Sequence, residues 1–122
     1  MSAMAGQGYQ DLVAWQRAMD LTERVYRLTS TWPKGEVFGL TSQIRRAASS
    51  VPANIAEGQG RNGPKEFLHF LGIANGSMRE VETYLILAFR LQYCDKATFD
   101  EVMRQATGAG NPLRGLIRSL RR

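Results

Sequence analysis

The sequence has few of the residues that enzymes and metalloproteins use to build their sites. It contains one cysteine, Cys94, and one histidine, His69. One cysteine excludes an intrachain disulfide and a CxxC pair, and one histidine excludes the paired Glu-x-x-His motifs of di-metal bundles. Gly58 and Gly60 flank a turn that lacks the Gly-Lys-Ser/Thr ending of a P-loop. We therefore expect a protein that is not an enzyme, with no metal, no cofactor and no small-molecule substrate.

Long apolar runs are also missing. No segment approaches the roughly 18 apolar residues that a membrane-spanning helix needs. Residues 1–8 have neither the charged nor the apolar region of a secretory signal, and small residues dominate them. We expect 1–8 to be a disordered tail and 9–122 to form a single domain. We also expect a cytoplasmic protein without membrane contact.

Lysine is scarce, although the chain is basic. The 16 cations comprise thirteen arginines and three lysines, and the formal net charge is +5. Guanidinium groups match phosphate and carboxylate geometry and stack on bases, which favours nucleic acid or an acidic partner. An equally good interpretation is that genome composition favours arginine and that these side chains only solvate helix faces.

What the sequence does have is helical periodicity, in four segments. Apolar residues recur every three or four positions in about 9–31, 38–58, 64–93 and 95–120. This spacing predicts an all-α bundle of four amphipathic helices. The third segment carries a heptad seam of Phe67, Leu71, Ala74, Met78, Val81, Leu85 and Ala88. It also has a second apolar row, so it must cover neighbours in its own bundle or in another subunit.

Two prolines interrupt this periodicity. Pro52 lies inside the second segment, where it removes a backbone donor and clashes with the carbonyl of Ala48. The apolar row continues in phase beyond Pro52, so we expect a kinked helix. In the fourth segment, residues 108–112 (GAGNP) are weak for a helix and predict a bend or a local break, after which helix can resume at Pro112.

Charged residues accompany the second and third segments. Arg45 and Arg46 lie close to the apolar row of the second segment, and Glu57, Glu80 and Glu82 follow. We expect one of these acids to form a structural ion pair with an arginine at a helix interface, which would fix helix register. Binding of a partner is the alternative.

The C-terminus has the pattern of a basic amphipathic helix. One of its faces carries Arg114, Arg118, Arg121 and Arg122, and apolar residues occupy the opposite side. Such a face is typical of surfaces that bind phosphate backbones or an acidic partner. Arg61 and Lys65 form a smaller basic group at the turn before the third helix. Solvated helix ends explain both groups equally well, and neither group resembles a base-reading module.

Several long motifs, taken in order, resemble one family. They are residues 9–19 (YQDLVAWQRAM), 39–48 (GLTSQIRRAA), 50–58 (SVPANIAEG), 66–77 (EFLHFLGIANGS) and 80–85 (EVETYL). Together they resemble the four-helix bundle proteins encoded in 23S rRNA intervening sequences, also called S23 ribosomal proteins. That family includes the accessory variability proteins of diversity-generating retroelements.

The resemblance implies an antiparallel up-down four-helix bundle that assembles as a homopentameric ring without enzyme activity. It also implies that basic surfaces bind nucleic acid and a protein partner, as in the retroelement relatives. The resulting hypothesis is a homo-oligomer that binds RNA or DNA backbones through arginines. The candidate residues are Arg45, Arg46, Arg61, Lys65, Arg114, Arg118, Arg121 and Arg122. The alternative is a protein–protein interaction scaffold that does not bind nucleic acid directly.

Overall fold

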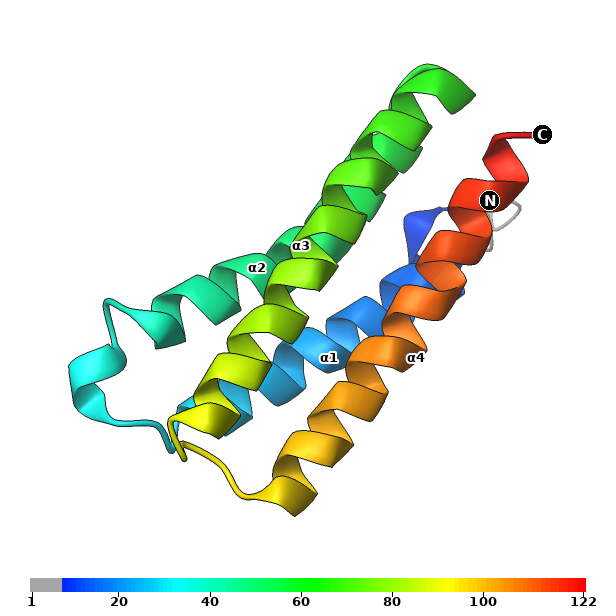
Figure 1. Cartoon of the computed structure of the whole chain (residues 1–122). Coiled ribbons are helices and arrows are strands. Elements are labelled where there is room, and N and C mark those ends of the chain that lie inside the picture. Colours follow the sequence, from blue (N-terminus) through cyan, green and yellow to red (C-terminus); the bar gives the residue numbers. More distant parts are fainter. Residues whose placement is uncertain (1–7) are drawn as a thin grey trace.

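The computed structural model describes residues 8–122 and consists mainly of four long helices (Figure 1). They are α1 (Val13–Thr29), α2 (Leu40–Gln59), α3 (Pro64–Arg90) and α4 (Lys96–Leu120). Short 3₁₀ helices, η2 (Tyr9–Asp11) and η3 (Lys34–Glu36), precede α1 and α2. Within 8–122 there is no strand, so the predicted all-α class is confirmed. The expected N-terminal tail lies outside the described residues except for Gly8.

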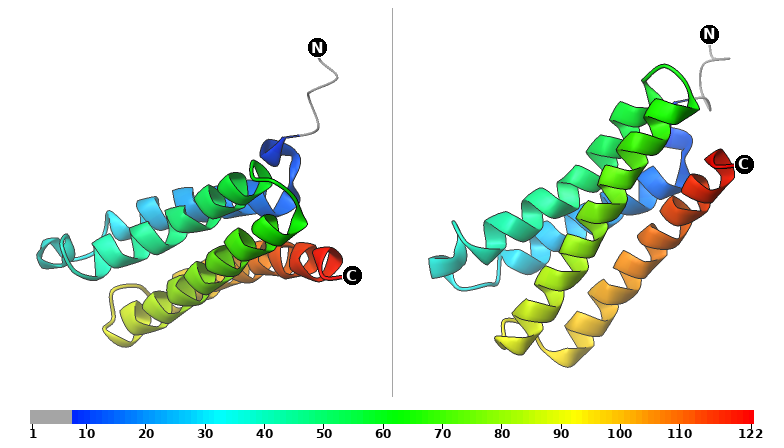
Figure 2. Two further views of the ribbon diagram at one scale, coloured as in Figure 1. Left: turned by 90° about the horizontal axis from the view of Figure 1, so that it is seen from above. Right: turned by 45° about the horizontal axis from the view of Figure 1, so that its top comes forward.

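The helices form an antiparallel up-down bundle, as predicted. Each helix packs against its neighbours in sequence, and contacts between α1 and α4 close the ring of four. Figure 2 shows the four helices side by side from two further directions. The turn between α2 and α3 and the C-terminus of α4 lie at the same end of the bundle (Figure 1).

The core is built from one apolar row of each helix. Its largest fully buried side chains are Leu21, Val25, Ile44, Val51, Ile55, Leu71, Met78, Val81, Leu85, Val102 and Leu113. From Leu71 to Ala88 the predicted heptad seam of α3 is buried throughout. The second apolar row of α3 is not covered in the same way, because Ile73, Leu87 and Leu91 are all exposed.

Both internal prolines lie within continuous helices. Helix α2 runs through Pro52, and Figure 1 shows its axis changing direction along its length, as the predicted kink requires. Because Pro52 has no N–H, the carbonyl of Ala48 loses its helical donor. The Thr22 hydroxyl of α1 reaches this carbonyl, with Oγ1 lying 3.0 Å from Ala48 O, and it shares its single proton with Ala18 O of its own helix, which lies 2.8 Å away.

In α4, Pro112 likewise leaves a backbone carbonyl without its helical donor. The helix continues from Lys96 to Leu120, so a local break at residues 108–112 is not observed. Pro112 cannot donate to the carbonyl of Gly108. The Arg17 guanidinium of α1 does so instead, with Nη1 lying 3.1 Å from Gly108 O. Helix α1 therefore supplies the missing donors on both of its neighbours.

The turn between α2 and α3 depends on two glycines. Gly63 has a φ of 93°, which side chains disfavour, and it precedes Pro64 at the start of α3. A Cβ on Gly58 would lie 2.7 Å from Phe70 Cβ, so only glycine allows the two helices to approach this closely. At the other end of the bundle, Asp95 caps α4 by accepting a hydrogen bond from the Thr98 N–H at 2.8 Å.

Candidate functional site

Arg114 and Arg118 of α4, and Arg121 directly after it, meet the first half of α3 around a pocket of about 230 Å³. We call it the arginine pocket. It is lined by Leu68, Gly72, Asn75, Arg114, Ile117, Arg118 and Arg121. Residues 68, 72 and 75 lie on one face of α3, and Lys65 precedes them by nearly one turn on that face. The helical spacing of four and three residues brings Arg114, Arg118 and Arg121 to the facing side of α4.

Arg114 forms the inner part of the arginine pocket. Its guanidinium folds over Gly110, where a Cβ would lie 2.9 Å from Nη1. Its Nη2 donates a hydrogen bond to Asn111 Oδ1 at 3.0 Å. Its Nη1 is buried and has no hydrogen-bond partner among the described residues, and the same is true of Asn75 Oδ1. Both walls of the pocket therefore carry unused hydrogen-bonding capacity.

The outer part of the arginine pocket carries positive charge that no acidic side chain among the described residues pairs with. Arg118 and Arg121 are exposed. Among residues 8–122 neither of them forms an ion pair. The sequence has no Asp or Glu after Glu101, so no carboxylate side chain of the last five turns of α4 neutralises them. Arg122 extends the same basic end of the chain.

Arg45 and Arg61, both predicted to bind nucleic acid, have intramolecular partners. Arg45 Nε donates to Thr29 Oγ1 at 2.7 Å, and its guanidinium lies 4.6 Å from the ring centroid of Tyr26. Arg61 forms an ion pair with Glu57 at 3.0 Å, and its guanidinium lies 5.1 Å from the ring centroid of Phe70. Arg45 thus ties α2 to α1, and Arg61 ties the end of α2 to α3.

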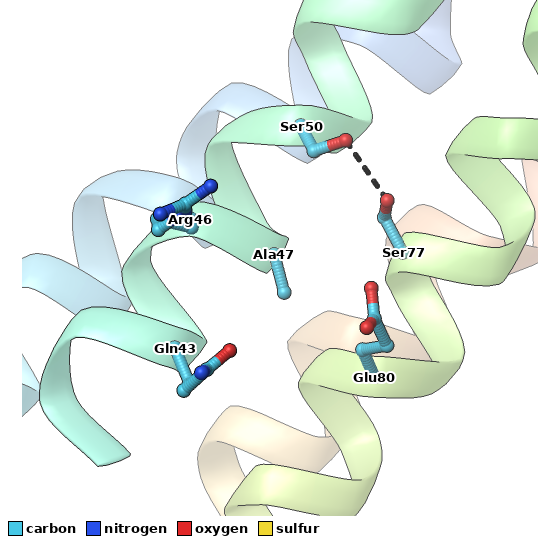
Figure 3. Close-up of a pocket in the computed structure, with 6 residues that line it drawn as sticks. All are labelled: Gln43, Arg46, Ala47, Ser50, Ser77 and Glu80. Carbon is cyan, nitrogen blue, oxygen red and sulfur yellow. Dashed lines mark hydrogen bonds between the residues drawn. The ribbon is translucent and has the colours of Figure 1, made fainter. Parts of the chain in front are cut away.

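Arg46 lies in a different place, a groove between α2 and α3 that Figure 3 shows in close-up. The groove has a volume of about 350 Å³ and is lined by Gln43, Arg46, Ala47, Ser50, Ser77 and Glu80. The Ser50 and Ser77 hydroxyls share a hydrogen bond of 2.9 Å across it. Arg46 and Glu80 face the groove, and within residues 8–122 neither has an ion-pair partner.

Among residues 8–122, none of the three acids forms the expected ion pair with an arginine of another helix. Glu57 of α2 pairs with Arg61 of the turn that follows, and Glu82 pairs with Arg79 at 3.0 Å within α3. A pair between helices does exist, but it joins other residues. Arg24 of α1 lies 2.6 Å from Glu101 of α4. Periodicity could not reveal it, because both residues lie on the polar faces of helices far apart in sequence.

Sequence reasoning also missed a polar contact at the opposite end of the bundle. The Tyr93 hydroxyl donates to Glu36 Oε2 at 2.5 Å, and the Leu40 N–H donates to Glu36 Oε1 at 3.0 Å. The hydrogen bond from Tyr93 is the main reason that the pKa of Glu36 is lowered, and the Leu40 N–H adds to this. The same bond raises the pKa of Tyr93. This end of the molecule thus carries a structural cap for α2.

Other chemistry is sparse in the described part of the chain. No three of its His, Cys, Asp or Glu side chains gather where they could hold a metal ion. Burial raises the pKa of the Cys94 thiol, and the charge of Asp95 adds to the shift. None of the helices formed by residues 8–122 combines the length and apolar character needed to cross a membrane.

Comparisons with known proteins agree with this architecture. The family of 23S rRNA-intervening sequence proteins matches residues 10–115. A solved structure from Bacteroides thetaiotaomicron, a protein of unknown function from the S23 ribosomal protein family, has the same fold. Its TM-score is 0.77 at 23% sequence identity, and the match covers 86% of this chain and 98% of that one. No curated protein matches the chain.

Proposed function

The chain belongs to the 23S rRNA-intervening sequence protein family, and from this premise we propose that it is a non-enzymatic homo-oligomer that binds RNA or DNA backbones. The main support is the arginine pocket. Arg118 and Arg121 are exposed there without an acidic partner among the described residues. Arginines that are free of internal pairs can neutralise phosphates and release the counterions that condense on nucleic acid.

The charges at this end of the bundle favour an extended anionic partner. Lys65 lies in the first turn of α3, and the turn between α2 and α3 that carries Arg61 lies at the same end of the bundle as the C-terminus (Figure 1). Contacts of this kind reach phosphates, which position a protein on nucleic acid without reading bases. We expect Arg118, Arg121 and Arg122 to contribute most. Arg45 contributes least, because its guanidinium is already bonded to α1.

A homo-oligomer is supported by the apolar surface that a single chain leaves uncovered. The side chains of Ile73, Leu87 and Leu91 are exposed along α3, and Phe38 is 95% exposed before α2. Apolar side chains that lie exposed along one helix can bury their surface against another copy of the chain. The homopentamer that the family resemblance implies would bring five basic ends together, which raises the avidity for a long strand.

An electrophoretic mobility-shift experiment at low salt tests nucleic-acid binding directly. Wild type should shift duplex DNA or structured RNA, and the double variant Arg118→Ala/Arg121→Ala should shift them much less. The matched control is Arg27→Ala/Arg104→Ala, which removes two other exposed arginines that have no ion pair in residues 8–122. Absence of any shift by wild type would refute the proposal.

A protein–protein scaffold is the second candidate, and the groove between α2 and α3 supports it. Arg46 and Glu80 face that groove without ion-pair partners in residues 8–122, so a partner chain can supply the missing charges. In this case Arg46→Ala should change the oligomer mass in light scattering, whereas Arg118→Ala and Arg121→Ala should be neutral. Arg45→Ala is less informative, because it also breaks the contact with Thr29.

A further inference from the structure

The arginine pocket contains two buried polar atoms that the fold itself does not use. Arg114 Nη1 and Asn75 Oδ1 both lack a hydrogen-bond partner among the described residues, although both are buried. Leaving a buried donor or acceptor unsatisfied costs about 1–3 kcal/mol, and more for a charged group. These two residues come from different helices and line the same pocket. The two walls of this pocket thus each contain one residue with unused hydrogen-bonding capacity.

The surroundings of these atoms favour an anion. Three guanidinium groups line the arginine pocket, and no carboxylate lines it. Leu68 and Ile117 supply apolar wall, which lowers the local dielectric constant and strengthens charge-assisted hydrogen bonds. The Asn75 amide carries both a donor and an acceptor, so its NH₂ group can turn toward an anion. At about 230 Å³ the pocket is smaller than most sites for drug-sized ligands, which begin near 300 Å³.

Glycine keeps the pocket open on the α3 side. Gly72 lines the pocket, and a Cβ there would meet no atom within 4 Å. Nothing in the packing of α3 therefore requires glycine at this position, and a helix former would stabilise the helix. A larger side chain at residue 72 has room to grow, but it would grow at the edge of the arginine pocket.

We propose that the arginine pocket binds a single phosphate group, held by Arg114, Arg118 and Arg121 with Asn75 at its inner wall. Guanidinium forks match phosphate oxygens and can donate two hydrogen bonds each. The phosphate is either the terminal group of a nucleic-acid strand or an internal phosphodiester. The source of the phosphate rests on the proposed function, whereas the pocket and its chemistry do not.

NMR titration of the full chain with inorganic phosphate tests the pocket itself, with sodium chloride at equal ionic strength as the reference. Wild type should show saturable shifts of the Asn75 side-chain amide and of the arginine Nε–H signals. Asn75→Asp places a carboxylate at the inner wall and should weaken phosphate binding about tenfold or more. The control Gln105→Glu makes the same change of charge on another face of α4 and should bind phosphate as wild type does.

Two substitutions that do not change the charge separate the effect of filling the pocket from the effect of changing the electrostatic potential of the protein. Gly72→Gln fills the edge of the pocket and should also weaken phosphate binding several-fold. Gly76→Gln lies one turn further along α3, is equally free of contacts within 4 Å and does not line the pocket, so it should bind as wild type. Circular dichroism confirms that each variant is folded. Phosphate shifts that match the chloride reference, or that persist in Asn75→Asp and Gly72→Gln, would overturn the proposal.

Oligonucleotides with and without a 5′-phosphate then show whether the bound phosphate is a strand end or an internal phosphodiester. If only the phosphorylated strand loses affinity in Asn75→Asp, the pocket holds a strand end. If both strands lose affinity equally, it holds an internal phosphodiester. Wild type that binds phosphate but no oligonucleotide would refute the proposed function and leave the pocket standing. Oligonucleotide binding that is unchanged in Asn75→Asp would show that nucleic acid does not use the pocket, which refutes the proposed source of the phosphate and leaves the proposed function standing.

Discussion

At the scale of single residues, Gly58 and Gly76 occupy opposite environments on adjacent helices. A Cβ at Gly58 would meet Phe70 Cβ at 2.7 Å, whereas a Cβ at Gly76 would meet nothing within 4 Å. Gly58→Ala should therefore lower the free energy of unfolding by about 1–3 kcal/mol through overpacking. Gly76→Ala should raise it by about 0.5–1 kcal/mol, because alanine loses less backbone entropy in a helix. Urea denaturation measures both, and equal effects would contradict the close approach at Gly58.

Glu36 gives the protein a defined response to acid. Because its pKa is lowered in the folded state, the ionised carboxylate favours folding above the ordinary pKa of 4.5, and this contribution is lost as the pH falls through the lowered value. Glu36→Gln should thus reduce the urea midpoint near pH 7 and match wild type in strong acid. Urea titrations from pH 7 to pH 3 measure the difference. A difference that does not shrink on acidification would contradict this account.

Single-residue roles were the least predictable feature of the sequence. Pattern reasoning found the basic residues of the α4 terminus, because their spacing alone places them on one face. It could not separate Arg45 from Arg46, although Arg45 bonds to Thr29 and Arg46 faces the groove. Asn75 carried no sequence signal, because its role depends on how α3 and α4 pack. The same reason hid the contact between Glu36 and Tyr93.

At the scale of helices, side chains of α1 donate hydrogen bonds to backbone carbonyls of its two neighbours, α2 and α4. Thr22 bonds to the carbonyl that Pro52 leaves free, and Arg17 bonds to the one that Pro112 leaves free. The bond to Ala48 is partly buried, where a carbonyl without a donor is costly, whereas the bond to Gly108 is exposed and water can also donate there. The bundle thus keeps both prolines inside continuous helices.

A double-mutant cycle tests this coupling. Thr22→Val keeps the shape of the side chain but removes its hydroxyl, and it should cost about 1–2 kcal/mol in the free energy of unfolding. In a Pro52→Ala background the new N–H can bond to Ala48, so the same change should cost about 1 kcal/mol less. Urea denaturation of the four proteins gives the coupling energy. Additive effects within error would show that Thr22 and Pro52 act independently.

Helix positions were largely predictable, and the exceptions have physical reasons. Periodicity placed α2 within two residues of its observed limits, because apolar spacing follows the buried face. The weak stretch at residues 108–112 suggested a break that does not occur. Local propensity argued for that break, but the Arg17 donor and the burial of Ala109 and Leu113 hold α4 in helical form. Such tertiary support cannot be read from the local sequence.

At the scale of the whole molecule, the exposed second row of α3 bears on assembly. Leu87 is 43% exposed on α3, whereas Val13 is 49% exposed on α1. If copies associate through α3, Leu87→Asp should lower the oligomer mass measured by light scattering, because it places a charge in an apolar interface. Val13→Asp is the matched control and should leave the mass unchanged. An unchanged mass in Leu87→Asp would exclude this face from the contact.

The bundle could be predicted from periodicity, but whether copies of the chain associate could not. A second apolar row on α3 indicated unburied surface, yet the same pattern fits either a neighbouring helix or another subunit. The fold removes part of this ambiguity, because α2 and α4 cover the first row and leave Ile73, Leu87 and Leu91 exposed. The charge pattern behaves similarly. The net charge alone is compatible with arginines that only contact water, whereas the structure places three of them around the arginine pocket.

The most direct test of nucleic-acid binding is the salt dependence of affinity for a fluorescent duplex, measured by anisotropy. A plot of log affinity against log salt should be linear, with a slope of roughly −0.9 for each phosphate neutralised. Arg118→Ala/Arg121→Ala should reduce the magnitude of that slope by about two, and Arg27→Ala/Arg104→Ala should leave it unchanged. A slope near zero in wild type, or an equal loss in both double variants, would contradict a role for the arginine pocket in binding nucleic acid.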